Sequence, residues 1–368
     1  MQFKSIELNR YSVYILIYHL LFLAFSFSSF FPMPIILVYL IGVFCIEFRS
    51  VSRNITYTLI FVILSAFGGI CFLFKGFYVN SSLIVYQLFF GIILQFYLER
   101  KIGHQIYGII LVVYSAFIYL NIFRGVDPDL ILHERSRNMV SFYTLIYTIY
   151  YYIEDYRWNK NVNIFPALNC AVLGLMLIGR SGIIVSLLLL LFIFFYQFSF
   201  ISNISKIKRI TIIVSTIAVF VYTNYQLLML LYESAFGRFI EFGVDGTGRE
   251  DILAMYSEKV KSDPISFIFG VSLNDPTFER FEYNLHNSFF SAHYFWGILS
   301  LIFFLLIVRT FLKKGHVFYK GLLLVLLIRS TTDQVFFIDF MDVIVYYLMF
   351  LILTKVPDVD FDRPVLSK

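Results

Sequence analysis

The chain has 368 residues, of which 60% are hydrophobic and 20% aromatic, while only 14% are charged. This composition excludes a water-soluble globular enzyme. The formal net charge of +5 comes from basic residues that lie between apolar stretches. It therefore does not form the basic stripe of a nucleic-acid-binding protein. The three cysteines have no C-x-x-C spacing, which excludes a disulfide framework and a zinc knuckle.

Apolar runs long enough to cross a bilayer follow one another through most of the chain. A membrane-spanning helix needs about 20 mainly apolar residues, and lipid cannot hydrogen-bond an exposed backbone, so helices are favoured over barrel strands. We predict an all-α, polytopic membrane protein with about twelve transmembrane helices and one long outer loop, forming a single transmembrane domain over residues 1–368. The predicted spans are 11–31, 33–48, 55–74, 79–98, 103–123, 139–153, 162–178, 181–200, 209–231, 288–308, 319–333 and 338–355.

The positions of Lys and Arg predict the orientation of these spans. Placing both termini in the cytoplasm puts most of the basic residues of the short loops on the inner side, as the positive-inside rule requires. The same alternation places the loop 232–287, between the ninth and tenth spans, on the outer face. This loop holds a large share of the charged residues of the chain.

The outer loop contains a predicted amphipathic helix. Thr247 followed by Glu250 forms a capping-box pattern, and apolar residues share one helical face before Asp263 and Pro264 end the run. We therefore predict a helix over 248–262. The segment from Pro264 to Ser272 is predicted to be extended and closed by a glycine, and the tenth span opens at the sequence Leu-His-Asn-Ser.

Arginines near the ends of predicted spans are candidates for function, because charged groups close to the bilayer are usually paired or functional. Arg180 joins two apolar spans at the outer face, and Arg329 lies near the outer end of the eleventh span. The alternatives are that both extend to lipid head groups, or that Arg329 pairs with Asp333 one helical turn later. Guanidinium groups suit phosphate through forked hydrogen bonds, and further arginines predicted at the same face are Arg249, Arg124, Arg135 and Arg137.

His286 is the histidine whose position best suits proton transfer. It is predicted to lie where the long outer loop re-enters the membrane, beside Asn287, and an imidazole there can accept a proton. The alternative is that Asn287 or Ser288 caps the tenth span and the histidine is incidental. The sequence lacks H-x-x-H and H-E-x-x-H patterns, and the pair Asp127 and Asp129 flanks a proline, which is typical of a solvated turn. We therefore expect no metal and no cofactor.

Several function classes lose support from motifs that the sequence does not contain. There is no G-x-S-x-G elbow, P-loop or dinucleotide fingerprint, so serine hydrolases, nucleotide-driven pumps and Rossmann enzymes are disfavoured. A polysaccharide or lipid transporter, the alternative from another class, predicts paired repeats with broken helices, and no internal repeat is visible.

The motifs between about 179 and 297 resemble those of the bacterial O-antigen polymerase and O-antigen ligase superfamily. They are Arg-Ser-Gly at an outer helix junction, Gly-Arg at the start of a loop helix, Phe-Gly-Val after it, and His-Asn-Ser-Phe opening a span. The Gly-Val is followed here by Ser-Leu-Asn, which departs from the glycine-rich continuation of the family. The matching positions are Arg180, Arg249 and His286.

The resemblance implies glycosyl transfer at the outer face of the bacterial cytoplasmic membrane. The implied partners are an undecaprenyl diphosphate-linked glycan donor, its acceptor and membrane lipids, with a chain-length regulator as a further candidate and no nucleic acid. The polymerase would join repeat units of an O-antigen or capsule, whereas the ligase would transfer the polysaccharide to the lipid A core. No residue distinguishes the two, and we favour the polymerase.

The chemistry of the reaction matches the candidate residues. Breaking the sugar-phosphate bond develops negative charge on a diphosphate, which Arg180 and Arg249 are suited to stabilise. An acceptor hydroxyl needs a base, for which His286 is the candidate, with Asn287 placed to orient it. A single base without a second nucleophile predicts inversion at the anomeric carbon. Further predicted substrate contacts come from Arg329, Arg135 and Arg137.

Overall fold

The computed structural model is helical, and no strand occurs among the residues that it describes. These are residues 9–27, 33–51, 55–76, 83–99, 102–133, 136–159, 162–199, 211, 229, 249–274, 276–281, 284–337 and 340–354. The all-α prediction is confirmed for this part of the chain. Nearly all of the ninth predicted span and the first part of the predicted outer loop, with Thr247 of the predicted capping box, lie outside it.

Five described segments are long and apolar enough to cross a membrane, and they support the prediction of a membrane protein. The twelve-span count and the position of the termini stay predictions. The five segments are Arg10–Phe27, Ile55–Lys75, Gln105–Phe123, Arg180–Gln197 and Ser288–Leu312.

The helices pack as two compact units, one made of residues 1–107 and 248–361, the other mainly of residues 108–247. The first unit joins segments from both ends of the sequence. Its elements are α1 (Arg10–Phe27), α2 (Met33–Val51), α3 (Ile55–Lys75), α4 (Leu83–Gln87), α5 (Phe90–Glu99), the start of α6 (His104–Phe123), α12 (Arg249–Ser262), α13 (Pro264–Phe269), η4 (Pro276–Phe281), α14 (Ser288–Trp296), η5 (Gly297–Leu299), α15 (Ser300–Leu312), α16 (Val317–Thr332), η6 (Phe340–Asp342) and α17 (Val343–Leu353).

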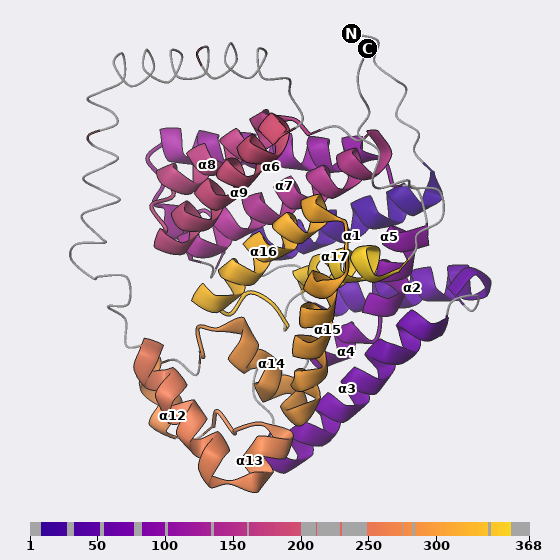
Figure 1. The fold of residues 1–368 in the computed structure, drawn as a ribbon, viewed down its shortest axis with the longest axis vertical. Helices are drawn as coiled ribbons and strands as arrows, with labels where there is room; N and C mark the ends of the chain where they lie inside the picture. Colours follow the sequence, from indigo (N-terminus) through magenta and orange to yellow (C-terminus); the bar gives the residue numbers. More distant parts are fainter. Residues whose placement is uncertain are drawn as a thin grey trace. The chain divides into compact units, whose positions relative to one another are not determined.

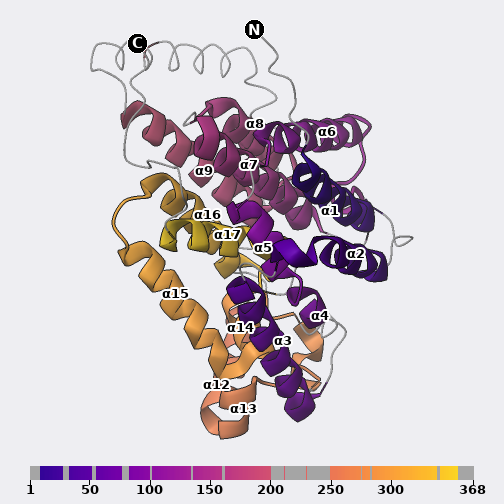
Figure 2. The same ribbon diagram turned by 90° about the vertical axis from the view of Figure 1, so that its right-hand side faces the viewer.

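An aromatic core holds the first unit together. The fully buried Trp296 stacks on Phe303, with ring centroids 4.7 Å apart, and Phe303 also contacts the ring of Tyr346. The indole Nε1 of Trp296 donates a hydrogen bond to Gln87 at the end of α4, at 3.1 Å. This bond joins residues 209 positions apart in the sequence, so the core fixes α14 against the N-terminal helices (Figure 2).

Two of the predicted continuous spans are broken in the structure. The span 79–98 is divided into α4 and α5 by a turn over residues 88–89. The span 288–308 is divided at Gly297, whose positive φ of 48° starts a short 3-10 helix between α14 and α15. A Cβ on Gly297 would overlap the carbonyl oxygen of Ile268, so the break lets the short helix α13 (Pro264–Phe269) approach closely. Apolar continuity in the sequence did not reveal either break.

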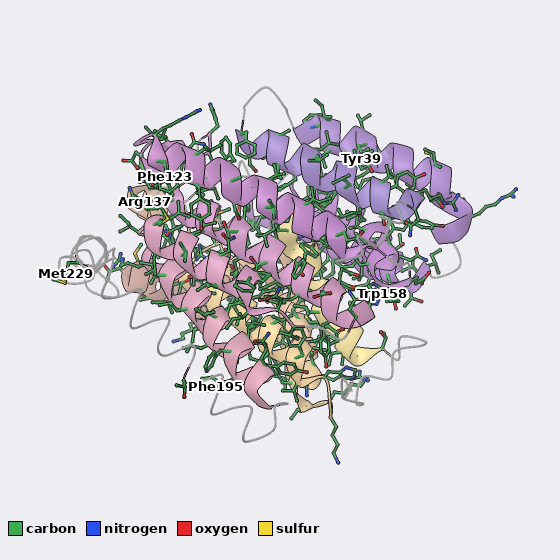
Figure 3. The ribbon with its side chains drawn as sticks, turned by 90° about the horizontal axis from the view of Figure 1, so that it is seen from above. Tyr39, Phe123, Arg137, Trp158, Phe195 and Met229 are labelled. Carbon is green, nitrogen blue, oxygen red and sulfur yellow. The ribbon has the colours of Figure 1, made fainter. Side chains whose placement is uncertain are left out.

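The second unit contains most of α6, η3 (Pro128–Leu130), α7 (Arg137–Asn159), α8 (Ile164–Met176) and α9 (Arg180–Ser199). Helix α7 extends beyond the predicted span 139–153 at its C-terminal end. There Trp158 donates to Glu154 at 2.9 Å and Asn159 donates to Asp155 at 2.7 Å, so side-chain bonds continue the helix. Figure 3 shows Arg137 and Trp158 at opposite ends of α7.

Small residues allow close packing in the second unit, as is common between membrane helices. A Cβ on Gly174 of α8 would overlap the Ser186 hydroxyl of α9, and one on Gly182 would overlap Ser141 of α7. These positions place the start of α9, and with it Arg180, directly against α7 and α8.

In the loop predicted to be external, the helix expected over 248–262 is confirmed as α12, which the structure shows from Arg249 to Ser262. The extended segment predicted after it is wrong over its first six residues, because Pro264–Phe269 forms the short helix α13. Asp263 caps this helix, Pro264 occupies its first position and Gly270 ends it with a φ of 86°. Proline suits the first turn of a helix, where its missing N–H is not needed.

Candidate functional site

His286 lies in a tight turn directly before α14. Asn284 Oδ1 accepts a hydrogen bond from His286 N at 2.8 Å. Asn287 Oδ1 accepts from Phe289 N and Phe290 N, at 2.9 and 3.3 Å, and so caps α14. Between these two asparagine turns, His286 adopts a φ of 48°, a left-handed conformation that is uncommon for residues other than glycine. The turn is therefore held by specific hydrogen bonds and projects the imidazole to one side.

The same turn is joined to the segment that follows α16. Ser288 Oγ donates to Asp333 O at 2.8 Å and accepts from the backbone N–H groups of Val335 and Phe336, both at 3.1 Å. Two further hydrogen bonds join the same two segments. Leu285 N donates to Gln334 Oε1, and Asn287 Nδ2 donates to Thr331 O. These five hydrogen bonds fix residues 284–288 against residues 331–336.

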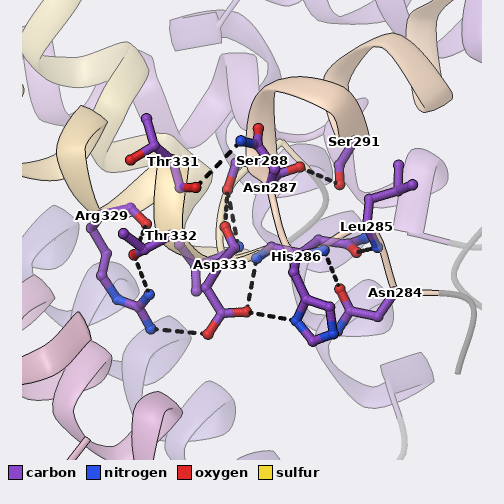
Figure 4. Close-up of polar contacts among 12 residues, drawn as sticks. Asn284, Leu285, His286, Asn287, Ser288, Ser291, Arg329, Thr331, Thr332 and Asp333 are labelled. Carbon is purple, nitrogen blue, oxygen red and sulfur yellow. Dashed lines mark hydrogen bonds and ion pairs between the residues drawn. The ribbon is translucent and has the colours of Figure 1, made fainter. Parts of the chain in front are cut away.

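Asp333 is the residue that this arrangement brings to His286 (Figure 4). Its Oδ1 lies 3.8 Å from His286 Nδ1, and its Oδ2 lies 3.3 Å from an Nη atom of Arg329. Arg329 also donates to Thr332 Oγ1 at 3.1 Å. The side-chain exposure rises from 1% for Arg329 to 15% for Asp333 and 31% for His286. The cluster thus has a buried cation at one end and a partly exposed imidazole at the other.

This geometry can support proton transfer. The carboxylate faces Nδ1 of His286, which leaves Nε2 as the ring nitrogen for an incoming proton. An imidazolium formed by that proton would lie beside the negative charge of Asp333. Arg329 in turn compensates this charge where it is most buried. The contact of Asp333 with His286 is electrostatic, because 3.8 Å is too long for a hydrogen bond and His286 Nδ1 has no hydrogen-bond partner among the described residues. A carboxylate beside a histidine is an arrangement that recurs in general bases.

The side chains of Asn287 and Arg329, both predicted to bind substrate, contact other groups of the protein in the structure. Asn287 uses its side chain to cap α14 and to reach Thr331, so the predicted alternative of a capping residue describes its observed contacts. Arg329 pairs with Asp333, which is the second alternative weighed from the sequence. Because its side chain is 1% exposed, its position favours a role in holding Asp333. Substrate binding by either residue stays a prediction.

The arginines predicted to meet the leaving group are described to different extents. Arg180 is the first residue of α9, half-buried, in the second unit. Arg249 begins α12 in the first unit, and its side chain lies outside the described residues. Arg135 lies outside them entirely. The predicted convergence of Arg180 and Arg249 on His286 therefore stays a prediction.

Arg137 is bound by two carboxylates at the start of α7. Its Nε donates to Asp129 Oδ2 at 2.9 Å, an Nη atom pairs with both Asp127 and Asp129, and its backbone N donates to Asp129 Oδ1 at 2.7 Å. The carboxylates of the D-x-D pattern are thus used to hold an arginine and the N-terminus of a helix. Substrate binding by Arg137 would have to compete with these partners.

Asp333 and Ser288 are the members of the site that sequence reasoning did not select. Asp333 was visible only as the residue one helical turn after Arg329, and Ser288 only as a possible cap. Their link to His286 depends on α14 and α16 packing together, which the sequence did not indicate. Comparison with protein-family models, with curated proteins and with solved structures returns no match to this chain.

Proposed function

We propose that the chain is a membrane glycosyltransferase that uses His286 as a general base to join lipid-linked oligosaccharide repeat units into a polymer at the outer face of the cytoplasmic membrane. The donor would be a glycan on undecaprenyl diphosphate, and the acceptor the next lipid-linked repeat unit. The observation that carries the proposal is the cluster of His286, Asp333 and Arg329, in which a partly exposed imidazole at the start of an apolar helix lies 3.8 Å from a carboxylate that pairs with a buried arginine.

In the proposed reaction, the acceptor hydroxyl gives its proton to His286 Nε2 while its oxygen attacks the anomeric carbon of the donor. The bond between that carbon and the diphosphate oxygen breaks, and the electron pair leaves with the diphosphate. General-base assistance of this kind contributes about 10²- to 10⁴-fold in rate. One displacement without a covalent intermediate inverts the anomeric configuration.

The charged residues have two further roles in the proposed reaction, one at His286 and one at the diphosphate. Asp333 stabilises the imidazolium during the attack, and Arg329 holds the Asp333 carboxylate in place, as a positioning residue. Arg249 and Arg180 are the proposed partners of the diphosphate, because forked guanidinium donors match phosphate oxygens. The apolar helices would surround the polyprenyl tail.

A complementation experiment tests the base. In a strain that produces lipid-linked single repeat units and lacks this protein, the wild-type chain should restore a ladder of surface polysaccharide. His286→Ala and Asp333→Asn should reduce the ladder by about 10²-fold or more, at normal amounts of protein in the membrane. His133→Ala, which changes an exposed histidine of the second unit, is the matched control and should leave the ladder unchanged.

The acceptor is tested separately. Purified protein with lipid-linked repeat units alone should yield longer lipid-linked glycans if it is a polymerase. A product only when lipid A core is added would identify a ligase and would contradict the proposed acceptor while preserving the role of His286. Normal ladders from His286→Ala would instead overturn the base itself.

A further inference from the structure

The short helix α13, in the predicted outer loop, exposes three large apolar side chains. Ile265, Phe267 and Ile268 are 56%, 44% and 39% exposed, and none of the six residues of α13 is buried. Exposed apolar area costs about 25 cal/mol per Å² relative to burial. Three neighbouring large apolar side chains therefore mark a surface that is suited to an apolar environment.

Helix α13 is packed onto the end of a candidate membrane span. The ring of Phe269 stacks on Phe74 of α3, with centroids 4.0 Å apart and an interplanar angle of 8°, and it also lies 6.4 Å from Phe67. On the same last turns of α3, Leu73 and Phe74 are 74% and 59% exposed. The apolar surface of α13 thus continues the outward-facing apolar surface of α3, as Figures 1 and 2 show for the positions of the two helices.

The position of α13 along α3 is fixed by backbone contacts. Gly297, between α14 and α15, lies so close to α13 that a Cβ would overlap the Ile268 carbonyl. A Cβ on Gly270 would lie 2.7 and 2.8 Å from the carbonyl oxygens of His293 and Tyr294 in α14. Helix α13 therefore packs against both α3 and α14.

The two ends of the segment differ in polarity. At its start, Asp263 Oδ2 accepts bonds from the Ser266 hydroxyl and N–H at 2.6 and 2.9 Å, and Oδ1 accepts from Ile265 N at 3.0 Å. These bonds lower the pKa of Asp263, which is half-buried. The preceding turn of α12 carries Lys259 and Lys261. Charged residues thus precede the apolar residues of α13, and this combination of charged and apolar groups is suited to a membrane interface.

We propose that α13 inserts into the lipid leaflet around the C-terminal end of α3, with Ile265, Phe267 and Ile268 among the acyl chains and with Lys261 and Asp263 at the level of the head groups. The occupant of this surface is bilayer lipid, because the surface is continuous with that of α3 and the flanking lysines suit lipid phosphates. With the predicted topology this is the outer leaflet. The inference is independent of the glycosyl-transfer proposal.

Spin-label accessibility in reconstituted liposomes tests the insertion. In a Cys45→Ser background, where the remaining cysteines are buried, single labels are placed by Ile265→Cys, Phe267→Cys and Ile268→Cys. Leu73→Cys provides the lipid-facing control and Ser262→Cys, at the exposed end of α12, the aqueous control. We expect the ratio of collisions with oxygen to collisions with a water-soluble nickel chelate to be several-fold higher at all three α13 positions than at Ser262.

Two results would overturn the proposal. Ratios equal to that of Ser262 would place α13 in water. Low accessibility to both reagents would show that protein, such as a second copy of the chain, covers the surface. Loss of glycosyl transfer in any variant would not affect the conclusion, because the label reports depth and not activity.

Discussion

Two clusters in the chain combine arginine with carboxylates, but they differ in which group is shared and in how far it is buried. In the first unit, the buried Arg329 contacts one oxygen of Asp333, and the other oxygen of this carboxylate faces His286. In the second unit, Arg137 takes up the carboxylates of both Asp127 and Asp129, which are 56% and 45% exposed. One cluster has a carboxylate that lies between an arginine and an imidazole, and the other has an arginine that lies between two carboxylates.

The difference shows what makes a charged cluster available for chemistry. Arg137 is neutralised twice, and its backbone N–H is also held by Asp129, so its contacts fix the turn before α7. Asp333 has one oxygen 3.8 Å from the imidazole of His286, which is 31% exposed. If this imidazole takes up a proton from a substrate, the carboxylate stabilises the resulting positive charge. Residue types alone do not separate the two clusters, whereas burial and sharing do.

The largest expected effect is that of Arg329→Met. Breaking a buried ion pair by removing one partner costs about 3 to 5 kcal/mol, since the remaining charge has lost its compensation. Equilibrium unfolding in mixed micelles should show a loss of this size. Arg329→Lys, which keeps the charge without the fork, should lose less. Wild-type stability of the Met variant would show that Asp333 does not depend on this arginine.

The next effect concerns the serine that joins the two segments of the site. Ser288→Ala removes the hydroxyl that serves Asp333 O, Val335 N and Phe336 N, and an unsatisfied buried group costs about 1 to 3 kcal/mol. We expect a loss of about 2 kcal/mol in the free energy of unfolding and, if the proposed function holds, shorter polysaccharide ladders. Ser291→Ala is the matched control, because Ser291 is equally buried in α14 but bonds only to Asn287 O in its own helix. Equal losses from both variants would contradict the bridging role.

The sequence predicted the helical class and much of the helix placement, but not the contacts that build the site. Apolar length and periodicity marked α3, α6, α9 and α16 to within a few residues, because these helices follow directly from burial in an apolar medium. Gly297 divides a span that appeared continuous, because its conformation follows from the close approach of Ile268. Such tertiary contacts have no signature in local composition.

The candidate site was accessible from the sequence only in part. His286 stood out because it lies where the predicted outer loop meets an apolar run and because it begins the His-Asn-Ser-Phe motif, and both are local patterns. Asp333 and Ser288 lie 45 positions apart and meet because α14 packs against α16. The ion pair of Arg329 with Asp333 was foreseen from helical spacing, but its extension to His286 was not.

Lys75 is a buried lysine whose ammonium group contacts no carboxylate among the described residues. Its ammonium lies 3.9 Å from the ring centroid of Tyr294 and 4.6 Å from that of Phe72, and among the described residues Nζ has no hydrogen-bond partner. Burying an ammonium without an acceptor is costly, while Met preserves most of the volume. Lys75→Met should therefore leave the free energy of unfolding unchanged or raise it by about 1 kcal/mol. A loss of stability would show that the cation-π contacts outweigh desolvation.

The smallest expected effect returns to the second cluster. Arg137→Met should lower the free energy of unfolding by less than about 1 kcal/mol, because the partner carboxylates are already solvated and the backbone bond to Asp129 survives. Adding salt should shrink this difference further, since exposed charges are screened, whereas the loss in Arg329→Met should persist because the pair is buried. Unfolding at low and high salt for both variants measures this contrast. If Arg137→Met proves as costly and as insensitive to salt as Arg329→Met, burial does not distinguish the clusters, and the case for His286 loses its structural basis.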